Sequence, residues 1–369
     1  MEQNSIHLPG LNGLRAIAAL SVVIAHVTLD GVADFGFSND FDFNMAAYGV
    51  TLFFVISGFL ITYLLIQEKE HKNTVNIKHF YVRRILRIWP IYYLYLLVAF
   101  IVMALLGRGR EMQVNEMWYY VFFATNFPFI FSTYIPVLAH YWSIGVEEQF
   151  YLFWPWIVRF SKESLLKMAV LIFILFFGIK VFFWWKFGLL DYTYRFLNIT
   201  RFHCMMVGAI GAIFYSQNKS WFIRLFSNKF VQLFSFTIFL LKGFELIYIP
   251  SVIVHEVLAV ASLSMIIGQI TVVRRIVNLE KTVFDFIGKI SYGMYVIHPV
   301  LILLLSRIIK PMPIQQGLRH LLAYVSTLTA TLFLAWLSYR YFEKPFLKLK
   351  NRFVVVKTSN SMLSTEEIQ

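Results

Sequence analysis

The sequence predicts an all-α integral membrane protein, a bundle of about ten transmembrane helices with both termini in the cytoplasm. Three observations predict this fold class: the scarcity of charge, the length of the apolar runs, and the distribution of Lys and Arg among the loops. The 369 residues are 59% apolar and only 14% charged, whereas a soluble domain carries about 25% charged residues. Because a chain with so few charges cannot form a fully water-exposed surface, we expect much of its surface to face lipid.

Ten apolar runs approach the length of about 20 residues that a transmembrane helix needs. They lie near residues 12–30, 46–66, 88–107, 145–160, 165–185, 198–216, 230–248, 252–271, 284–307 and 318–342. A further run, 118–131, is short and interrupted by Asn126 and Pro128, so we expect a re-entrant or interfacial segment there. The first run ends in acidic sequence without a small-residue cleavage site, which indicates a retained helix rather than a cleaved signal peptide.

The distribution of basic residues among the loops predicts how the bundle is oriented in the membrane. Loops that this arrangement places in the cytoplasm hold 20 Lys and Arg residues, and the exported loops hold 8, as the positive-inside rule requires. The net charge of +13 is explained in this way, and a nucleic-acid partner is not expected. We expect one membrane domain over residues 1–350 and a short polar cytoplasmic tail over 351–369.

The chain contains one cysteine, Cys204, within an apolar stretch. This excludes an intrachain disulfide framework and a cysteine-based metal cluster. Its histidines and acids show no metal-ligand spacing on any one helix, so no metal is expected.

Two ionisable residues share a face of the first expected helix. Arg15 and His26 are eleven residues apart, which leaves them within about 20° of each other and roughly 16 Å apart along the axis. A charge within a span costs about 2.5–3.5 kcal/mol on insertion scales and therefore needs a reason. His26 can take a proton near neutral pH. The alternatives are a structural bond to another helix for His26 and snorkelling to the headgroups for Arg15.

Three arginines, Arg83, Arg84 and Arg87, lie at the cytoplasmic mouth of the third expected helix. Arg83 and Arg87 are four residues apart and share one face if this segment is helical. Clustered guanidinium groups suit phosphates, either of a nucleotide-bearing cofactor or of lipid headgroups. The alternative is an ordinary positive-inside anchor.

Two adjacent acids, Glu147 and Glu148, head the fourth expected helix. Successive side chains on a helix point about 100° apart, so we expect at most one of the two to face the bundle interior easily. One carboxylate could stabilise the helix N-terminus through the helix dipole. The other could orient a histidine or bind a sugar hydroxyl.

His298 stands directly before Pro299 in the ninth expected helix. The proline removes one helical hydrogen bond and frees the carbonyl of Tyr295, so we expect a kink with polar capacity inside the membrane. His298 beside this kink is a functional candidate, with a packing role as the alternative. Helix-end placement or interhelical bonding is expected for five further polar residues: Arg201, His203, His255, Glu256 and Asp285.

Six segments, taken together and in this order, resemble the acyltransferase-3 family of membrane O-acyltransferases. They are residues 10–26 with Arg15 and His26, 49–60 (GVTLFFVISGFL), the three arginines, 142–151, 291–299 and 341–345 (YFEKP). The resemblance extends over residues 8 to about 347. Any one of the six segments would be a weak signal, and it is their occurrence in this order that makes the resemblance specific. One departure is Thr51, where many members have Asp, so any role for a carboxylate there is lost or moved elsewhere.

The resemblance implies transfer of an acyl group, most often acetyl, from cytoplasmic acetyl-CoA or another acyl-CoA to a hydroxyl of an exported or cell-surface glycan. His26 matches the key histidine of the family and would deprotonate the acceptor hydroxyl, with an acyl-histidine intermediate as the rival mechanism. Arg15 would meet the pantetheine or phosphate end of the donor, or position its helix. The chain looks like the stand-alone form, without an extracytoplasmic hydrolase-like domain, of a bacterial inner-membrane enzyme.

Further roles follow from the resemblance for the remaining polar residues. Arg83, Arg84 and Arg87 would bind the phosphates of coenzyme A. Glu147 or Glu148, together with His298, would bind the acceptor or orient the base.

A transporter or flippase for a lipid-linked glycan or metabolite is the competing functional class. Ten spans, a kinked helix and charges within the membrane would suit it as well. Against it, no matched pair of Gly/Pro-broken helices is evident in the two halves. The expected partners of an acyltransferase are acyl-CoA, a glycan or lipid-linked glycan acceptor and the bilayer. The sequence does not name the acceptor, which we expect the outer loops 31–45 and 107–144 to select.

Overall fold

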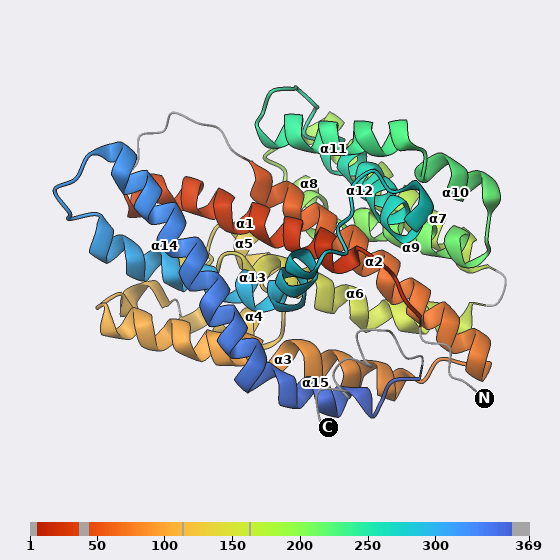
Figure 1. Cartoon of the computed structure of the whole chain (residues 1–369), viewed down its shortest axis with the longest axis horizontal. Coiled ribbons are helices and arrows are strands. Elements are labelled where there is room, and N and C mark those ends of the chain that lie inside the picture. The colour runs from red at the N-terminus through yellow and green to blue at the C-terminus, as the bar shows by residue number, and fades with distance from the viewer. Residues whose placement is uncertain (1–5, 37–43, 113, 162–163, 356–369) are drawn as a thin grey trace.

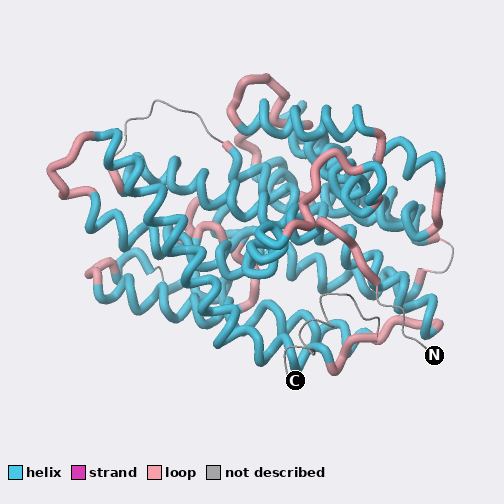
Figure 2. The backbone as a smooth tube through the Cα atoms, in the orientation of Figure 1, coloured by secondary structure: helices cyan, strands magenta, loops and turns pink. Residues whose placement is uncertain are grey.

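A computed structural model describes residues 6–36, 44–112, 114–161 and 164–355. Over these ranges every regular element is a helix and no strand is present, as Figure 2 shows. The predicted all-α class is therefore confirmed. A helix also occupies each of the ten ranges at which a span was expected.

The helices, labelled as in Figure 1, follow one another along the whole described chain. The α-helices are α1 (Leu11–Asp34), α2 (Met45–Lys72), α3 (Ile77–Leu105), α4 (Met117–Val121), α5 (Asn126–Phe131), α6 (Tyr141–Phe160), α7 (Leu165–Phe187), α8 (Tyr192–Thr200), α9 (Phe202–Ser216), α10 (Ser220–Phe226), α11 (Lys229–Gly243), α12 (Val254–Ile270), α13 (Thr282–Ile309), α14 (Gln316–Leu337) and α15 (Lys344–Asn351). The short 3₁₀ helices are η1 (Gly109–Met112), η2 (Val114–Glu116), η3 (Pro136–Leu138) and η4 (Val272–Arg274), and the π-helix η5 (Ser338–Glu343) joins α14 to α15.

Seven of the described helical segments are long and apolar enough to cross a membrane. They are α1, α2, α3, α7, α8 with α9, α13, and α14 continued through η5 and α15. The other three expected spans are helical but shorter or more charged. Helices α11 and α12, with 15 and 17 residues, rise only roughly 23 and 26 Å, against about 30 Å of hydrocarbon. Helix α6 has 20 residues but includes Glu147, Glu148 and Arg159. The chain is a multi-pass membrane protein, while the count of ten and the orientation of the termini stay predictions.

Two helices begin earlier than the sequence indicated. Helix α3 begins at Ile77 rather than near residue 88, because the Asn76 side chain accepts a hydrogen bond from the backbone N–H of His79 and caps it. Helix α6 begins at Tyr141 rather than at residue 145. Both shifts bring polar residues inside regular helix, and both bear on the site described below.

Helices α1, α2 and α13 form the centre of the bundle, with α1 packed against both others and α2 packed against α9 (Figure 1). The α2–α9 contact is close because it is made through glycines. A Cβ atom on Gly58 would lie 2.0 Å from the carbonyl oxygen of Met205, and one on Gly208 would lie 2.2 Å from that of Val55. Such backbone contact is the usual means by which small residues bring membrane helices together.

The outer surface of the bundle is apolar. Helix α7 buries only Ala169 and Lys180, and it exposes large side chains such as Leu171 and Ile174. Helix α14 likewise exposes a row of apolar residues. These faces are suited to contact with lipid.

Candidate active site

Two adjoining cavities lead into the bundle. The outer cavity has about 1260 Å³ of empty space including its mouth, and it is lined by the segment before α1 and by α1, α2, α3 and α15. The inner cavity has about 710 Å³ of empty space including its opening, and it lies among α1, α2, α3, α6 and α13. Three residues, Arg15, Arg84 and Arg87, line both cavities. These arginines therefore mark the junction between the two cavities.

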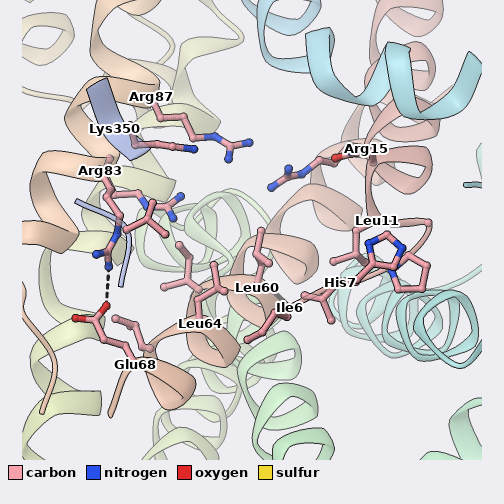
Figure 3. A pocket seen from close by; sticks show the side chains of 18 of the residues that line it. Ile6, His7, Leu11, Arg15, Leu60, Leu64, Glu68, Arg83, Arg87 and Lys350 are labelled. Carbon is pink, nitrogen blue, oxygen red and sulfur yellow. Dashed lines mark hydrogen bonds and ion pairs between the residues drawn. The ribbon is translucent and has the colours of Figure 1, made fainter. Parts of the chain in front are cut away.

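The junction gathers three guanidinium groups. The carboxylates of Glu147, Glu148 and Glu343 act on them electrostatically, but none of these acids forms an ion pair with them in the described structure. Arg15 extends from α1 toward Arg87 on α3 across the outer cavity, as Figure 3 shows. Neither residue has a hydrogen bond or an ion pair with any described residue. The guanidinium of Arg84 lies over the rings of Phe80, at 5.5 Å, and Tyr151, at 5.4 Å, and its Nε atom has no partner. A concave site lined by unpaired guanidinium groups is suited to binding a phosphorylated anion.

Arg83 lines the same cavity but is already engaged. Its Nη2 atom pairs with Glu68 Oε2 at 2.9 Å, and its Nη1 atom donates to the carbonyl of Phe353 at 2.8 Å. Glu68 also accepts a hydrogen bond from the backbone N–H of Asn76 at 2.8 Å. Of the three arginines expected to meet phosphate, Arg83 is thus the one whose charge is neutralised within the protein.

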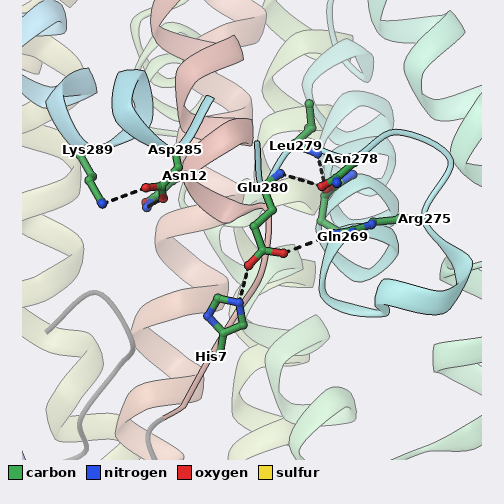
Figure 4. Close-up of polar contacts among 9 residues, drawn as sticks. All are labelled: His7, Asn12, Gln269, Arg275, Asn278, Leu279, Glu280, Asp285 and Lys289. Carbon is green, nitrogen blue, oxygen red and sulfur yellow. Dashed lines mark hydrogen bonds and ion pairs between the residues drawn. The ribbon is translucent and has the colours of Figure 1, made fainter. Parts of the chain in front are cut away.

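Carboxylates at the mouth of the outer cavity are paired with other residues, as Figure 4 shows. Asp285 accepts a hydrogen bond from Asn12 Nδ2 at 2.7 Å and pairs with Lys289 at 2.8 Å. Glu280 pairs with His7 and with Arg275. These contacts tie the segment before α1 to the loop before α13, and neither Asp285 nor Glu280 is paired with an arginine of the junction.

The two acids of α6 separate into different surroundings. Glu147 lines the inner cavity and accepts hydrogen bonds from Ser57 Oγ at 2.9 Å and Tyr151 OH at 3.0 Å. Glu148 turns toward α3, where Trp89 Nε1 donates to it at 3.2 Å. Neither acid caps the helix, because α6 begins at Tyr141 and both lie beyond its first turn. The capping role considered from the sequence is therefore wrong.

His26 and His298 form a directly bonded pair. Nδ1 of His26 lies 2.8 Å from Nε2 of His298, although the two residues are 272 positions apart in the chain. His298 is fully buried, whereas His26 is only partly buried. His26 is therefore the less buried member of the pair.

The hydrogen-bond partners assign the tautomers of both rings. Nδ1 of His298 lies 3.1 Å from the carbonyl of Met294, and because a carbonyl only accepts, this nitrogen carries the proton. The Nε2 atom of neutral His298 is then an acceptor, so His26 donates to it from Nδ1. The Nε2 atom of His26 keeps its lone pair and has no hydrogen-bond partner among the described residues. This atom is a candidate general base or nucleophile.

Side chains stabilise α13 around Pro299. The backbone N–H of Val300 donates to Tyr95 OH at 3.2 Å, and His140 Nε2 donates to the carbonyl of Val296 at 3.2 Å. The Tyr295 carbonyl, freed by the proline, faces the His298 ring, and the next carbonyl, of Val296, accepts from His140. His140 is buried, and its other ring nitrogen, Nδ1, has no partner within the described structure.

The inner cavity ends one layer of side chains from the histidine pair. Ser143 and Tyr295 line the cavity, and their hydroxyl oxygens are 2.5 Å apart. Tyr295 OH also donates to the backbone carbonyl of His140 at 2.9 Å. The His140 ring packs 5.4 Å from that of His298. His26 itself does not line the inner cavity.

A second polar cluster lies among α2, α7, α9 and α12. The fully buried Lys180 pairs with Glu256 at 2.7 Å, and His203 lies 2.8 Å from the same carboxylate oxygen. Arg201, held at φ 48° between α8 and α9, donates to Thr51, which also bonds His255. The interhelical bonding expected for these residues is confirmed. Lys180 escaped notice in the sequence because it lies within a long apolar run.

Other residues of the site were not singled out from the sequence. Ser57 and Tyr151 lie within segments that carry the family resemblance, and His140 lies just before one of them, but nothing in their spacing assigned them a role. Glu68 and Lys350 lie outside those segments, and only the folding of α15 against α3 brings Lys350 to the outer cavity.

Comparison with known proteins gives matches along most of the chain. The profile of a family described as an acyltransferase domain matches residues 8–340. A Staphylococcus aureus (strain COL) protein provisionally named an O-acetyltransferase is 28% identical over 371 residues, which cover 93% of this chain and 58% of that protein. The O-acetyltransferase OatA of Staphylococcus aureus (strain NCTC 8325 / PS 47) is 26% identical over 373 residues, covering 93% of this chain and 57% of OatA. The chain thus spans less than two thirds of the length of these relatives. No solved structure matches it significantly.

Proposed function

The chain belongs to the acyltransferase-3 family, and on that premise we propose that it is a membrane O-acyltransferase. It moves an acyl group, in the first place acetyl, from acyl-CoA to a hydroxyl of an exported or cell-surface glycan. One observation carries this proposal: a junction of arginines without ion pairs opens into an inner cavity that ends one layer of side chains from a histidine pair, in which one ring nitrogen has no partner among the described residues. The printed names of the relatives, O-acetyltransferases, favour acetyl as the acyl group.

The donor enters the outer cavity with its acyl end directed inward. Its phosphates meet Arg15, Arg84 and Arg87 at the junction, where these guanidinium groups form no ion pair with a described carboxylate. Its pantetheine arm and thioester extend into the inner cavity toward Ser143 and Tyr295. Bidentate guanidinium–phosphate contacts supply both affinity and orientation. Glu147, held by Ser57 and Tyr151, is a polar group on the wall beside the arm.

The chemical step is the exchange of a thioester for an oxygen ester. Nε2 of His26 takes the proton of the acceptor hydroxyl while the hydroxyl oxygen attacks the thioester carbonyl. The carbon–sulfur bond then breaks, and the thiolate of coenzyme A takes the proton back from the imidazolium. His298 holds His26 in the required tautomer throughout. In the rival acyl-histidine mechanism the same Nε2 atom attacks the carbonyl first, so both mechanisms need this lone pair.

The proposed location is a bacterial inner membrane, with the termini and the outer cavity on the cytoplasmic side. Seven helices suited to crossing a membrane and bacterial relatives support this location. The excess of basic residues in the loops at the arginine-lined end supports the orientation. Acyl-CoA is available in the cytoplasm, which is where this orientation places the mouth of the cavity.

The test is the transfer of label from ¹⁴C-acetyl-CoA in membranes that contain the protein. We expect label in ester linkage, released by mild alkali, in the glycan fraction of wild-type membranes. His26→Ala should reduce it to background, whereas His71→Ala, at an exposed histidine near the end of α2, should leave it unchanged. Wild-type activity in well-expressed His26→Ala membranes would refute the assignment of the base. Label that remains on the protein when acceptor is withheld would identify the acyl-histidine route.

The same experiment distinguishes an acyltransferase from the competing functional class, a transporter or flippase. A transporter or flippase would export its substrate without any acyl modification, so mass analysis of the glycan would show no added acetyl group in membranes with or without the protein.

A further inference from the structure

The C-terminal helix forms part of the wall of the outer cavity. Helix α15 packs against α3, and the residues Lys350, Val354 and Val355 line the cavity. The segment after α15 is held in place by two contacts. Arg83 donates to the carbonyl of Phe353 at 2.8 Å, and the ring of His79 packs 5.5 Å from the ring of Phe353. A polar tail was expected from residue 351. Its first residues, 351–355, instead pack against the protein and form part of the wall of this cavity.

Lys350 places a further unpaired cation in the outer cavity. Figure 3 shows Lys350 beside Arg87, with both side chains directed toward Arg15 across the opening. Arg15, Arg83, Arg84 and Arg87 are the charged groups that act most strongly on Lys350, and all four are cations. Within the described structure its ammonium has no hydrogen bond and no ion pair. Like charges brought together in this way repel one another, and a bound polyanion removes the repulsion.

The positions of the basic residues in the two cavities determine which part of a bound acyl-CoA would contact each of them. Arg15, Arg84 and Arg87 line both cavities, whereas Lys350 lines only the outer one. In coenzyme A the acyl group is followed by the pantetheine arm, the pyrophosphate, and then the ribose with its 3′-phosphate. With the thioester in the inner cavity, the pyrophosphate falls at the junction. The ribose phosphate then falls in the outer cavity, on the side where Lys350 lies.

We propose that Lys350 is a ligand of the ribose 3′-phosphate of the donor, so that helix α15 completes the donor site. This inference rests on the proposed function and assigns a binding residue within it. The ligand chemistry is a phosphate monoester dianion, which an ammonium binds as a compact point charge. Arg83, already paired with Glu68, holds the wall through Phe353 while Lys350 meets the ligand.

The test compares two donors, acetyl-CoA and acetyl-3′-dephospho-CoA, by equilibrium binding to purified protein in nanodiscs of neutral lipid. Wild-type protein should bind the dephospho donor about tenfold more weakly, as expected for the loss of one charge-assisted contact. Lys350→Gln should weaken acetyl-CoA binding by the same factor and leave binding of the dephospho donor unchanged. Lys350→Arg should restore most of the difference. Lys348→Gln, at an exposed lysine on the same helix that does not line the cavity, serves as the matched control and should behave as wild type.

Three outcomes would overturn the inference, and they are distinguishable from failure of the proposed function. Equal weakening of both donors by Lys350→Gln would show that the lysine supports the wall and does not meet the 3′-phosphate. No weakening of either donor would remove Lys350 from the site. Loss of acetyl-CoA binding when neutral lipid is replaced by phosphatidylglycerol, with Lys350→Gln relieving the loss, would assign the cation to a lipid phosphate. If wild-type protein binds neither donor, the proposed donor itself is wrong.

Discussion

At the scale of single residues, the proposed chemistry depends on one atom, Nε2 of His26. The sequence identified both His26 and His298 as candidates, one by its position in the first helix and the other by its place beside Pro299. Their contact could not be predicted, because residues 272 positions apart meet only through the packing of α1 against α13. The bond from His298 to the Met294 carbonyl, which assigns the tautomers, is also a property of the folded helix.

Replacing His298 tests whether it sets the tautomer of His26. His298→Leu removes the acceptor of the Nδ1 proton, so the lone pair of His26 is no longer confined to Nε2. We expect kcat to fall about 100-fold and the KM for acetyl-CoA to stay unchanged, because His298 does not line the outer cavity. His298→Gln offers a carbonyl oxygen to the same proton and should recover part of the rate. Equal losses of kcat in the two variants, measured by steady-state kinetics, would show that His298 contributes packing alone.

The arginines at the cavity differ in whether they have an ion-pair partner: Arg83 has one and Arg87 does not. Arg87→Gln should raise the KM for acetyl-CoA by about tenfold or more, because an unpaired guanidinium at the junction is lost. Arg83→Gln should change that KM less, but it leaves Glu68, whose side chain is only 4% exposed, without its cation. Breaking a buried pair costs roughly 3 kcal/mol or more of unfolding free energy.

Steady-state kinetics and thermal unfolding of the two variants in detergent measure this division. A larger rise in KM for Arg83→Gln than for Arg87→Gln would contradict the assignment of Arg83 to the wall. The sequence predicted a common role for both arginines, because their spacing of four residues places them on one face of α3. What separates them is Glu68, which reaches Arg83 from α2.

At the scale of the helices, the apolar runs predicted where most helices lie. They did not predict where helices with polar ends begin. Helix α3 extends into the charged segment because Asn76 caps it, and α6 extends back to Tyr141. Helix α8 was not expected, because residues 192–197 were placed in an outer loop, whereas Arg201 lies at a helix end, as its polar character allowed. The π-helix η5 was also not expected, because its bonds depend on contacts such as that of Ser338 with Glu343.

The crossing of α2 and α9 predicts a strong dependence on side-chain size. Gly58→Ala would place a Cβ atom 2.0 Å from the Met205 carbonyl oxygen, so one backbone must move. Overpacking of this kind costs about 1–3 kcal/mol, and we expect a lower unfolding temperature in detergent. The control is Gly178→Ala in α7, where no atom lies within 4 Å of the added Cβ. Unchanged stability of Gly58→Ala would show that the two helices are not in backbone contact.

At the scale of the whole molecule, the scarcity of charge and the length of the apolar runs were enough to predict a helical membrane protein. The arrangement of the helices was not, because apolar faces of similar composition can pack against one another in many ways. The chain order gave no indication that α1 lies between α2 and α13, or that α15 returns to α3 beside the outer cavity. The separation of the polar residues into an arginine-lined outer cavity and a histidine pair deeper in the bundle follows from that arrangement.

The central claim is that the bundle passes an acyl group from a cytoplasmic thioester to a hydroxyl on the other side of the membrane. The most direct measurement uses sealed inverted vesicles, which expose the cytoplasmic face outward and enclose the acceptor. ¹⁴C-acetyl-CoA, which does not cross the bilayer, is added outside, and label is then measured in the enclosed glycan. We predict labelled glycan in wild-type vesicles without detergent and none in His26→Ala vesicles. Labelling only after detergent, or only in right-side-out vesicles, would contradict the claim.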